Sequence, residues 1–460
     1  MGAGKQPAGD GYPASPLVAP QPLAPLAKAL RRGDLDLGDY IEATLDRVDE
    51  LESSIRALLP EAGRRERLRA EAAALAARYP IAEERPPLFG VLLGVKDIYA
   101  ADGFDTRAGS SLPPELFAMP EGPVVAALRK AGALVLGKTV TTEFAYFAPG
   151  PTGNPWDLKR TPGGSSSGSA ASIAAGFCSI ATGTQTIGSI ARPAAFCGVA
   201  GWKPRYGRLS REGIVPFSPS VDHAGLFAPD AAGLALAASV AAGDWDAARH
   251  TNALAAFASK PPVLAVPDGP YLMQAEPEGL AGFERQLVSL AGLGFTIVRI
   301  RAMNDIAGIN ARHRRICAAD MARVHKDWFA VHQALYAKAS AELILTGQGI
   351  EDKELESDKL GREALRADLD AALAASGARF WISPSAPGAA PQGLEATGNP
   401  IMNLPWTHAG LPTLTLPAGR SAGGMPLGMQ VAGAFNEDEE LLALGMLIEE
   451  RLCAPASLSA

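Results

Sequence analysis

The chain has 460 residues, of which 47% are hydrophobic and 20% charged, as is ordinary for a globular enzyme. Lys and Arg number 42 against 49 Asp and Glu, so the formal net charge is −7. This acidic balance argues against nucleic acid or an anionic membrane as the main partner, because both select for clustered basic residues.

The chain begins with a stretch rich in Pro, Gly and Ala, residues 1–24, which predicts a flexible N-terminal arm ahead of one large domain over residues 25–460. A helix is expected over residues 38–58, with Asp36 as its N-cap. Its apolar residues recur at helical spacing on one stripe: Ile41, Leu45, Val48, Leu51 and Ile55. A second helix is expected over residues 63–79.

Short aliphatic runs bounded by glycine follow, and this pattern is typical of buried strands. The strands are expected at 88–99, 133–140, 263–268, 295–300, 381–386, 413–419 and 427–433. Helices are expected at 123–131, 169–176 and 437–451, and residues 302–378 are strongly helical and are expected to shape a substrate pocket. Strands mixed with helices over the whole length predict an α/β fold.

Three short segments carry the candidate chemistry: GVKD (94–97), TPGGSSSGSA (161–170) and GTQTIGSIARPAAFCG (183–198). The last two are rich in Gly or Ser where apolar packing would be expected. Glycine lets another backbone or a ligand approach closely, and loops of this kind present N–H groups to negative charge. The segments therefore predict a site built partly from backbone amides.

In this order and spacing, the segments resemble the amidase signature family, whose catalytic set is a serine, a cis-serine and a lysine. The family's G-G-S-S-G-G-S loop corresponds to residues 163–169, Ser189 stands at the family's spacing from Ser165, and its V-K-D lysine corresponds to Lys96. Further similar pieces lie at 138–145, 154–156, 196–204 and 410–412. The resemblance implies a central mixed β-sheet covered by helices on both faces.

The resemblance further implies that Ser189 is the nucleophile, Ser165 a proton relay after a cis peptide bond to Gly164, and Lys96 the base. A serine hydroxyl alone is a poor nucleophile and needs a base within hydrogen-bond reach. A lysine can be that base only when neutral, and burial lowers its pKa. Lys96 follows the apolar run VLLGV, so the sequence itself predicts that it is drawn into the core.

The backbone around the nucleophile is expected to form an oxyanion hole, from the N–H groups of Ile187, Gly188 and Ser189 with Thr186. The residues expected to bind substrate are Gly164, Ser166, Gln185 and Arg192. For Arg192, a substrate carboxylate and a structural ion pair both remain open. The expected products are a carboxylate and ammonia or an amine, and neither a metal nor an organic cofactor is expected.

The loop departs from the pattern G-T-D-x-G-G-S-I-R of many family members. Gln185 replaces the Asp, Ile187 replaces the first Gly, and Arg192 falls one position later. These differences make the chain look more like the small-amide and biuret- or allophanate-type members than like the glutamine amidase of tRNA amidotransferase.

Several patterns have competing interpretations. Residues 132–139 match the P-loop expression, but ALVL within them is strand-like and an extended strand does not wrap a phosphate. Residues 164–168 match the nucleophile elbow G-x-S-x-G, so a Ser-His-Asp hydrolase using Ser166 with His408 or His223 is an alternative. A flexible Gly/Ser linker and an inactive binding homologue are further alternatives.

Other polar residues are assigned lesser roles. Asp97 and Asp222 are expected to be structural, although Asp97 could pair with Lys96. His325 and His408 are candidates to line the substrate pocket. The six histidines show no metal-ligand spacing.

The four cysteines lack C-x-x-C spacing and predict free thiols rather than disulfides or a zinc site: Cys178, Cys197, Cys317 and Cys453. With no signal-like apolar segment or membrane-length apolar run, the expected location is the cytoplasm. The expected partner is a small-molecule amide, without nucleic acid or membrane, and a homodimer or a small accessory subunit is possible.

Overall fold

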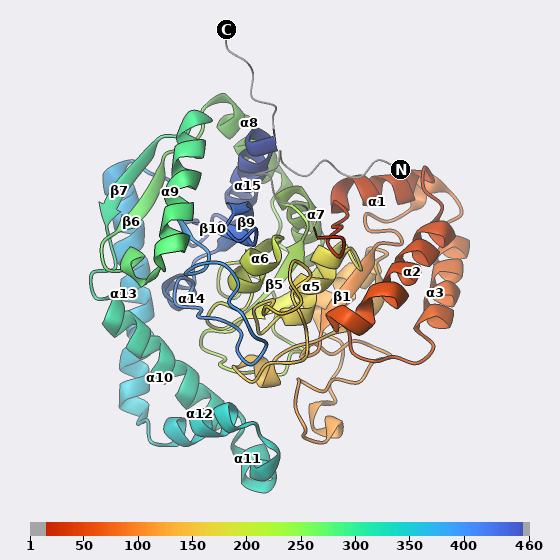
Figure 1. Cartoon of the computed structure of the whole chain (residues 1–460), viewed down its shortest axis with the longest axis horizontal. Helices are drawn as coiled ribbons and strands as arrows, with labels where there is room; N and C mark the ends of the chain where they lie inside the picture. The colour runs from red at the N-terminus through yellow and green to blue at the C-terminus, as the bar shows by residue number, and fades with distance from the viewer. Residues whose placement is uncertain (1–14, 454–460) are drawn as a thin grey trace.

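One mixed β-sheet organises residues 15–453, the part of the chain that this computed structural model describes (Figure 1). Its ten strands are β1 (Leu92–Lys96), β2 (Leu134–Thr139), β3 (Ile180–Gln185), β4 (Ala200–Lys203), β5 (His223–Ala228), β6 (Leu264–Asp268), β7 (Ile297–Arg301), β8 (Phe380–Pro384), β9 (Thr413–Arg420) and β10 (Pro426–Ala432). They lie in the order β2-β1-β3-β5-β4-β9-β10-β8-β6-β7. The pairs at the two ends of the sheet are parallel and the central pairs are antiparallel.

Helices cover both faces of the sheet, as expected. They are α1 (Leu23–Arg32), α2 (Leu37–Ile55), α3 (Arg64–Arg78), α4 (Pro123–Lys130), α5 (Ser167–Ala175), α6 (Ala191–Cys197), α7 (Ala231–Ala241), α8 (Ala247–Ser259), α9 (Pro277–Gly292), α10 (Ile306–Val324), α11 (Lys326–His332), α12 (Lys338–Gln348), α13 (Asp352–Ser376), α14 (Leu404–Ala409) and α15 (Asp438–Cys453). Side chains alternate between the two faces of a strand. On β4, Gly201 faces α6, while the neighbouring Leu414 on β9 faces α15 on the opposite side.

The strands and helices expected from periodicity are confirmed. Helix α2 begins after Asp36, whose carboxylate accepts a hydrogen bond of 3.0 Å from the backbone N–H of Asp39, as an N-cap does. Helix α5 begins at Ser167, two residues earlier than predicted, because the Ser-rich loop already turns into its first helical turn. Among residues 15–453, no helix is both long and apolar enough to cross a lipid bilayer.

The sequence predicts a flexible arm over residues 1–24, but the part of it that the structure describes, residues 15–24, packs on the body. Helix α1 already begins at Leu23, whose side chain is fully buried. Ahead of it, Ala19 donates its backbone N–H to Ala174, and the Ser15 hydroxyl donates to the carbonyl of Pro155. Hydrogen bonds that composition does not reveal therefore hold Ser15 and Ala19 on the body, whereas residues 1–14 lie outside the described part.

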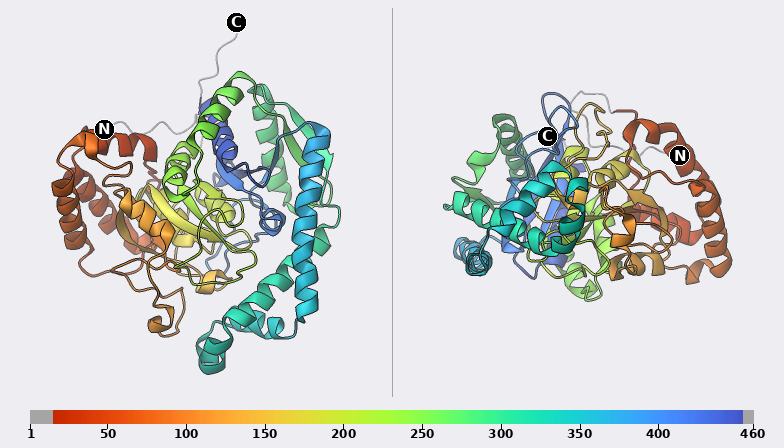
Figure 2. Two further views of the ribbon diagram at one scale, coloured as in Figure 1. Left: turned by 180° about the vertical axis from the view of Figure 1, so that it is seen from behind. Right: turned by 90° about the horizontal axis from the view of Figure 1, so that it is seen from below.

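Helices α10 to α13 form a projecting unit, here called the helical arm (residues 306–376), which confirms the helical character predicted for 302–378. Figures 1 and 2 show the arm running along one side of the body and extending beyond it. Its base packs against the body, since α10 and α13 both contact α14.

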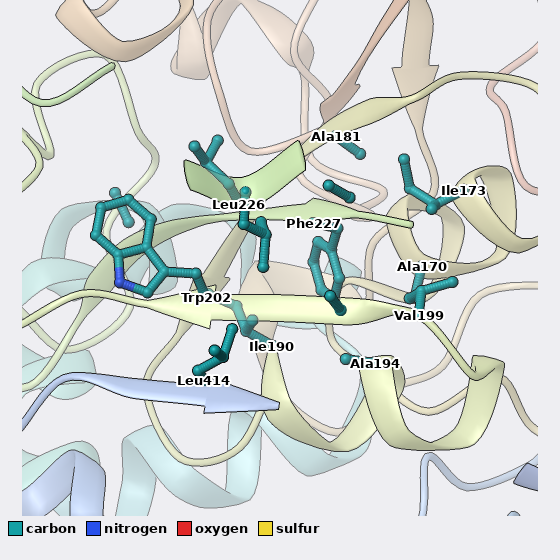
Figure 3. Packing of buried hydrophobic residues seen from close by; sticks show 14 of the residues in the cluster. Ala170, Ile173, Ala181, Ile190, Ala194, Val199, Trp202, Leu226, Phe227 and Leu414 are labelled. Atoms are coloured by element: carbon teal, nitrogen blue, oxygen red, sulfur yellow. The ribbon is translucent and has the colours of Figure 1, made fainter. Parts of the chain in front are cut away.

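The core beneath the Ser189 loop is assembled around Ile190, which lies at the start of α6 on the face of the sheet that also carries Phe227 (Figure 3). Ile190 lies over three strand glycines, one each on β3, β5 and β4. A Cβ added at Gly183, Gly225 or Gly201 would come within 3.3, 2.5 and 3.0 Å of Ile190 side-chain carbons, respectively. The small residues on the strands thus let the loop that carries Ser189 lie directly on the sheet.

Candidate active site

The three segments singled out in the sequence meet at the carboxyl ends of strands β1 and β3. β1 and β3 are parallel neighbours, so their carboxyl ends lie side by side. Lys96 is the last residue of β1, and the Ser189 loop follows β3 directly. Ser165 lies in the loop before α5, a helix that packs on β1 and β3.

Lys96 is wholly removed from solvent, with an exposed fraction of 0%. Its Nζ makes hydrogen bonds of 2.8 Å with the hydroxyl oxygens of Ser165 and of Thr184. Burial lowers the pKa of Lys96 well below its ordinary value, although the carboxylate of Asp222 opposes this shift. Burial therefore favours the neutral form of Lys96, and its Nζ is in contact with Ser165.

Thr184 was not singled out in the sequence. It lies on β3, and Thr182 two residues earlier faces the same side, where its hydroxyl accepts a bond of 2.9 Å from the Lys96 backbone N–H. The sequence does show threonines at alternating positions of this strand, which would place them on one face. Only the pairing of β1 with β3 shows that both of them contact Lys96.

The peptide bond between Gly164 and Ser165 is cis, as predicted. Arg192 holds this turn: its Nη2 donates to the Gly164 carbonyl at 2.6 Å and to the Thr397 hydroxyl at 3.1 Å, and its Nη1 donates to the Gly398 carbonyl at 2.8 Å. Burial lowers the pKa of Arg192 to about 9.

Neither role expected for Arg192 matches this geometry. Within residues 15–453 it has no acidic partner, so it forms no structural ion pair. Its terminal nitrogens are directed at protein oxygens rather than at a substrate carboxylate, although part of the side chain borders the small pocket described next. Its observed function is to bind the backbone beside Ser165.

Ser189 and Ser165 line one narrow slot of about 10 Å³. The other lining residues are Ala145, Tyr146, Phe147, Ile187, Gly188, Arg192 and Pro400. Both serine hydroxyls border this space, although no hydrogen bond joins them within residues 15–453. The backbone N–H groups of Ile187, Gly188 and Ser189 donate to no acceptor in the described part of the chain. Three consecutive unpaired donors beside a serine hydroxyl are available to bind a negatively charged oxygen.

Gln185 supports this loop instead of binding substrate. Its side-chain oxygen accepts bonds of 2.9 Å from the N–H groups of both Ile190 and Ala191, and its nitrogen donates to the Thr407 hydroxyl at 2.9 Å. With its polar atoms occupied and no exposed surface, Gln185 has nothing left to offer a ligand. The neutral amide of Gln185 thus binds the N–H groups at the start of α6, as the carboxylate of an Asp at this position would do.

Gly164 and Ser166 also differ from the expected substrate contacts. A Cβ at Gly164 would lie 2.6 Å from the Thr397 side chain, so close packing explains the glycine. The Ser166 hydroxyl is buried and faces the backbone N–H and carbonyl of Thr184, each at 3.4 Å. Since Ser166 has no histidine partner within the described residues, the alternative Ser-His-Asp site is wrong.

None of the six histidines is among the residues that line the slot. His408 faces His313, with 3.3 Å between their Nδ1 atoms, and His325 lies in an aromatic cluster against Phe144 and Tyr336. His223 Nδ1 lies 2.7 Å from the Val221 carbonyl. His325 and His408, expected to line the substrate pocket, are not among the residues that line the slot.

Asp97 and Asp222 have the structural roles expected. Asp97 pairs at 3.0 Å with Lys138, not with Lys96. Because Lys138 lies on strand β2 and serves this pair, the P-loop match has no phosphate-binding geometry. Asp222 accepts the Thr186 hydroxyl at 2.5 Å and the N–H groups of Phe217 and Ser218.

A larger cavity of about 470 Å³ is lined by Thr184, Thr186 and Asp222 and by residues between Gly207 and Phe217, and it shares Ala145 with the slot. In the described residues, no group of three or more His, Cys, Asp or Glu side chains is placed to hold a metal ion.

Cys178, Cys197 and Cys317 are buried free thiols, and the side chain of Cys453 lies outside the described part.

Fold and motifs together define an enzyme class that acts on amide C–N bonds. Residues 39–442 match the family model described as Amidase, and the chain belongs to that family. It is similar to the A subunit of glutamyl-tRNA(Gln) amidotransferase from Synechococcus sp. (strain RCC307), with 32% identity over 93% of this chain and 97% of that protein.

Solved structures agree with this family. An amidase crystal structure is 32% identical, with a TM-score of 0.82 over 94% of this chain and 100% of the other. A structure from a vestigial protein complex, described as revealing the evolutionary origins of an s-triazine catabolic enzyme, is 28% identical, with a TM-score of 0.83 over 94% of this chain and 98% of the other.

Proposed function

We propose that this enzyme hydrolyses a carboxamide to a carboxylate and ammonia or an amine, through an acyl-enzyme on Ser189. The observation that carries the proposal is the contact between the buried Lys96 and Ser165, beside a slot that Ser165 shares with Ser189. Ser165 contacts the lysine and can relay a proton, which leaves Ser189, with an exposed fraction of 7%, as the attacking group.

The first step is attack by the Ser189 hydroxyl on the amide carbon. Ser165 accepts the proton of Ser189 while giving its own to the neutral amine of Lys96, across the 2.8 Å hydrogen bond. The carbonyl oxygen becomes an oxyanion, which the unpaired N–H groups of Ile187, Gly188 and Ser189 can bind. One such donor is typically worth about 3–4 kcal/mol in the transition state.

The second half of the reaction reverses the proton path. The lysine returns its proton through Ser165 to the leaving nitrogen, and the C–N bond breaks to leave an ester on Ser189. Water then attacks that ester, with the same lysine as base, and releases the acid. This sequence uses Ser165 and Ser189, which line the slot, and Lys96, which contacts Ser165 from outside it.

The slot favours a compact acyl group, because the side chains of Tyr146, Phe147 and Ile187 narrow it beside the nucleophile. A small amide or urea-derived amide, as in biuret- and allophanate-type members, is the substrate class that we propose. The structure related to an s-triazine catabolic enzyme is consistent with this class.

A second candidate is glutamine amide cleavage within an assembly, since relatives at 31–33% identity are amidotransferase A subunits. Such a protein would work with further subunits. A homodimer or a small accessory subunit is also compatible with the first candidate.

The test is a comparison of ammonia release from small amides, ureas and glutamine by the wild type and by Ser189→Ala and Ser166→Ala. Added hydroxylamine should divert the acyl-enzyme into a hydroxamate. We expect wild type and Ser166→Ala to release ammonia from a small amide and to form hydroxamate, while Ser189→Ala does neither. Equal activity of Ser189→Ala would contradict the proposal, and turnover of glutamine alone would favour the second candidate.

A further inference from the structure

Two buried histidines from distant parts of the chain lie directly behind the proposed oxyanion loop. His313 is on α10, at the base of the helical arm, and His408 is on α14; both have an exposed fraction of 0%. His313 Nε2 lies 2.9 Å from the carbonyl oxygen of Thr186, and the two Nδ1 atoms lie 3.3 Å apart. Figure 1 shows α14 beside the helical arm, and α10 and α14 contact one another.

The partners of each nitrogen fix where the protons lie. A carbonyl oxygen can only accept, so His313 Nε2 carries a proton and donates it to Thr186. In the neutral ring, Nδ1 of His313 then has a lone pair, which takes a bond from Nδ1–H of His408. Burial lowers the pKa of His313 to about 3 and that of His408 to about 2, so both rings are neutral at ordinary pH.

The carbonyl that His313 holds determines the direction of an N–H group in the slot. In a planar trans peptide, the C=O and the N–H point to opposite sides. Because the Thr186 carbonyl points toward His313, the N–H of Ile187 in the same peptide unit points away from it. The Thr407 hydroxyl acts likewise on the next unit: it donates to the Ile187 carbonyl at 2.8 Å and so orients the N–H of Gly188.

We infer that His313 is a positioning residue, which orients the Ile187 N–H of the oxyanion loop through the Thr186 carbonyl, with His408 holding its ring. The inference rests on the proposed function, because an oxyanion must form at Ser189. It also couples the helical arm to the reacting atoms, since His313 belongs to α10 and Thr186 to the loop after β3.

Two variants at His313, each with a side-chain amide, distinguish its bond to the Thr186 carbonyl from simple packing of its ring in the cavity. In His313→Gln, the amide nitrogen can take the place of Nε2 and keep the bond to Thr186. In His313→Asn, the shorter side chain places its nitrogen near the former Nδ1, facing His408, and cannot reach Thr186. Both variants remove the imidazole, and both leave a polar amide in the same cavity.

The measurement is the rate of labelling of Ser189 by a serine-directed fluorophosphonate, resolved into its limiting rate and its half-saturating concentration. The phosphonyl oxygen occupies the oxyanion position, so the limiting rate reports on the hole. We expect His313→Asn to lose about tenfold or more in limiting rate, with little change in half-saturation, and His313→Gln to recover most of that loss. Melting temperatures of the two variants should be similar.

Two outcomes would overturn the inference: labelling of His313→Asn at the wild-type rate, or equal losses in both variants, which would indicate packing alone. If His313→Asn does not fold, His313→Leu takes its place against His313→Gln with the same expectation. A wild type that labels at a residue other than Ser189 would instead refute the proposed function, and the inference would fall with it.

Discussion

The Nζ of Lys96 lies 2.8 Å from the hydroxyl oxygen of Ser165, in a position that solvent does not reach. Burial makes an ammonium unfavourable there, and the neighbouring Thr184 hydroxyl supplies a second partner at 2.8 Å. A lysine in this place is costly for stability, and its contact with Ser165 beside the slot is the physical reason for which we propose catalysis there.

Replacing Lys96 with Met should abolish fluorophosphonate labelling of Ser189 or slow it by a factor of about a hundred or more, because the relay then has no base. Lys203→Met is the matched control. Lys203 is equally buried, and burial lowers its pKa to about 7, but its Nζ donates to the carbonyls of Pro204 and Leu411. The control should label at close to the wild-type rate, and equal loss in both variants would contradict the role of Lys96.

Lys96 should also make stability depend on pH. Its pKa is lowered in the folded state, so between the folded and unfolded pKa values the unfolded chain binds more protons than the folded one. The free energy of unfolding of the wild type should therefore rise relative to that of Lys96→Met as pH increases toward about 10. The expected slope is about 1.4 kcal/mol per pH unit between the folded and unfolded pKa values of Lys96. Urea unfolding of both proteins at pH 7 and pH 9 measures it, and a constant difference between the two proteins would count against a neutral lysine.

Gly188→Ala should damage the oxyanion loop while leaving the fold intact. The added Cβ would lie 2.5 Å from Asn403 Oδ1 and 2.8 Å from the Pro400 Cβ, so the loop must shift. Labelling of Ser189 should slow by about tenfold or more, since donors act only when aimed at the oxyanion. Gly243→Ala is the control, because nothing lies within 4 Å of its added Cβ; a rate for Gly188→Ala equal to that of the control would show that the loop does not need this geometry.

Asp97→Asn should destabilise the protein by about 3–5 kcal/mol, because the buried Lys138 would lose its ion-pair partner. Molecules that remain folded should still label at Ser189, since Asp97 does not contact the serines. Thermal unfolding and labelling at low temperature together test this separation. Loss of labelling from a protein that is still folded would instead assign Asp97 to the reaction.

The sequence could predict the parts of the site that lie within short motifs. Lys96, the cis bond at Ser165 and the Gly-rich loop before Ser189 each follow from local segments in register with the family pattern. The contacts that fix these groups come from elsewhere in the chain: Thr407 reaches Ile187, and His313 reaches Thr186, across long stretches of sequence. Single-sequence periodicity carries no information about such pairs, because the packing of distant elements determines them.

The same limit explains the corrected residues. The sequence predicts substrate contacts for Gln185 and Arg192, because polar residues beside a nucleophile often make them. Both instead satisfy buried backbone groups, at the start of α6 and at Gly164, respectively. A buried polar group must find a partner, and which partner it finds depends on strand order and helix placement, which a motif does not encode.

The most direct test is the site at which a fluorophosphonate attaches, mapped by peptide mass spectrometry in the wild type and in Ser189→Ala. The Lys96–Ser165–Ser189 relay predicts one adduct, on the peptide that contains Ser189, and none in Ser189→Ala. An adduct on Ser166, or on any serine that persists in Ser189→Ala, would contradict the assignment of Ser189 as the nucleophile.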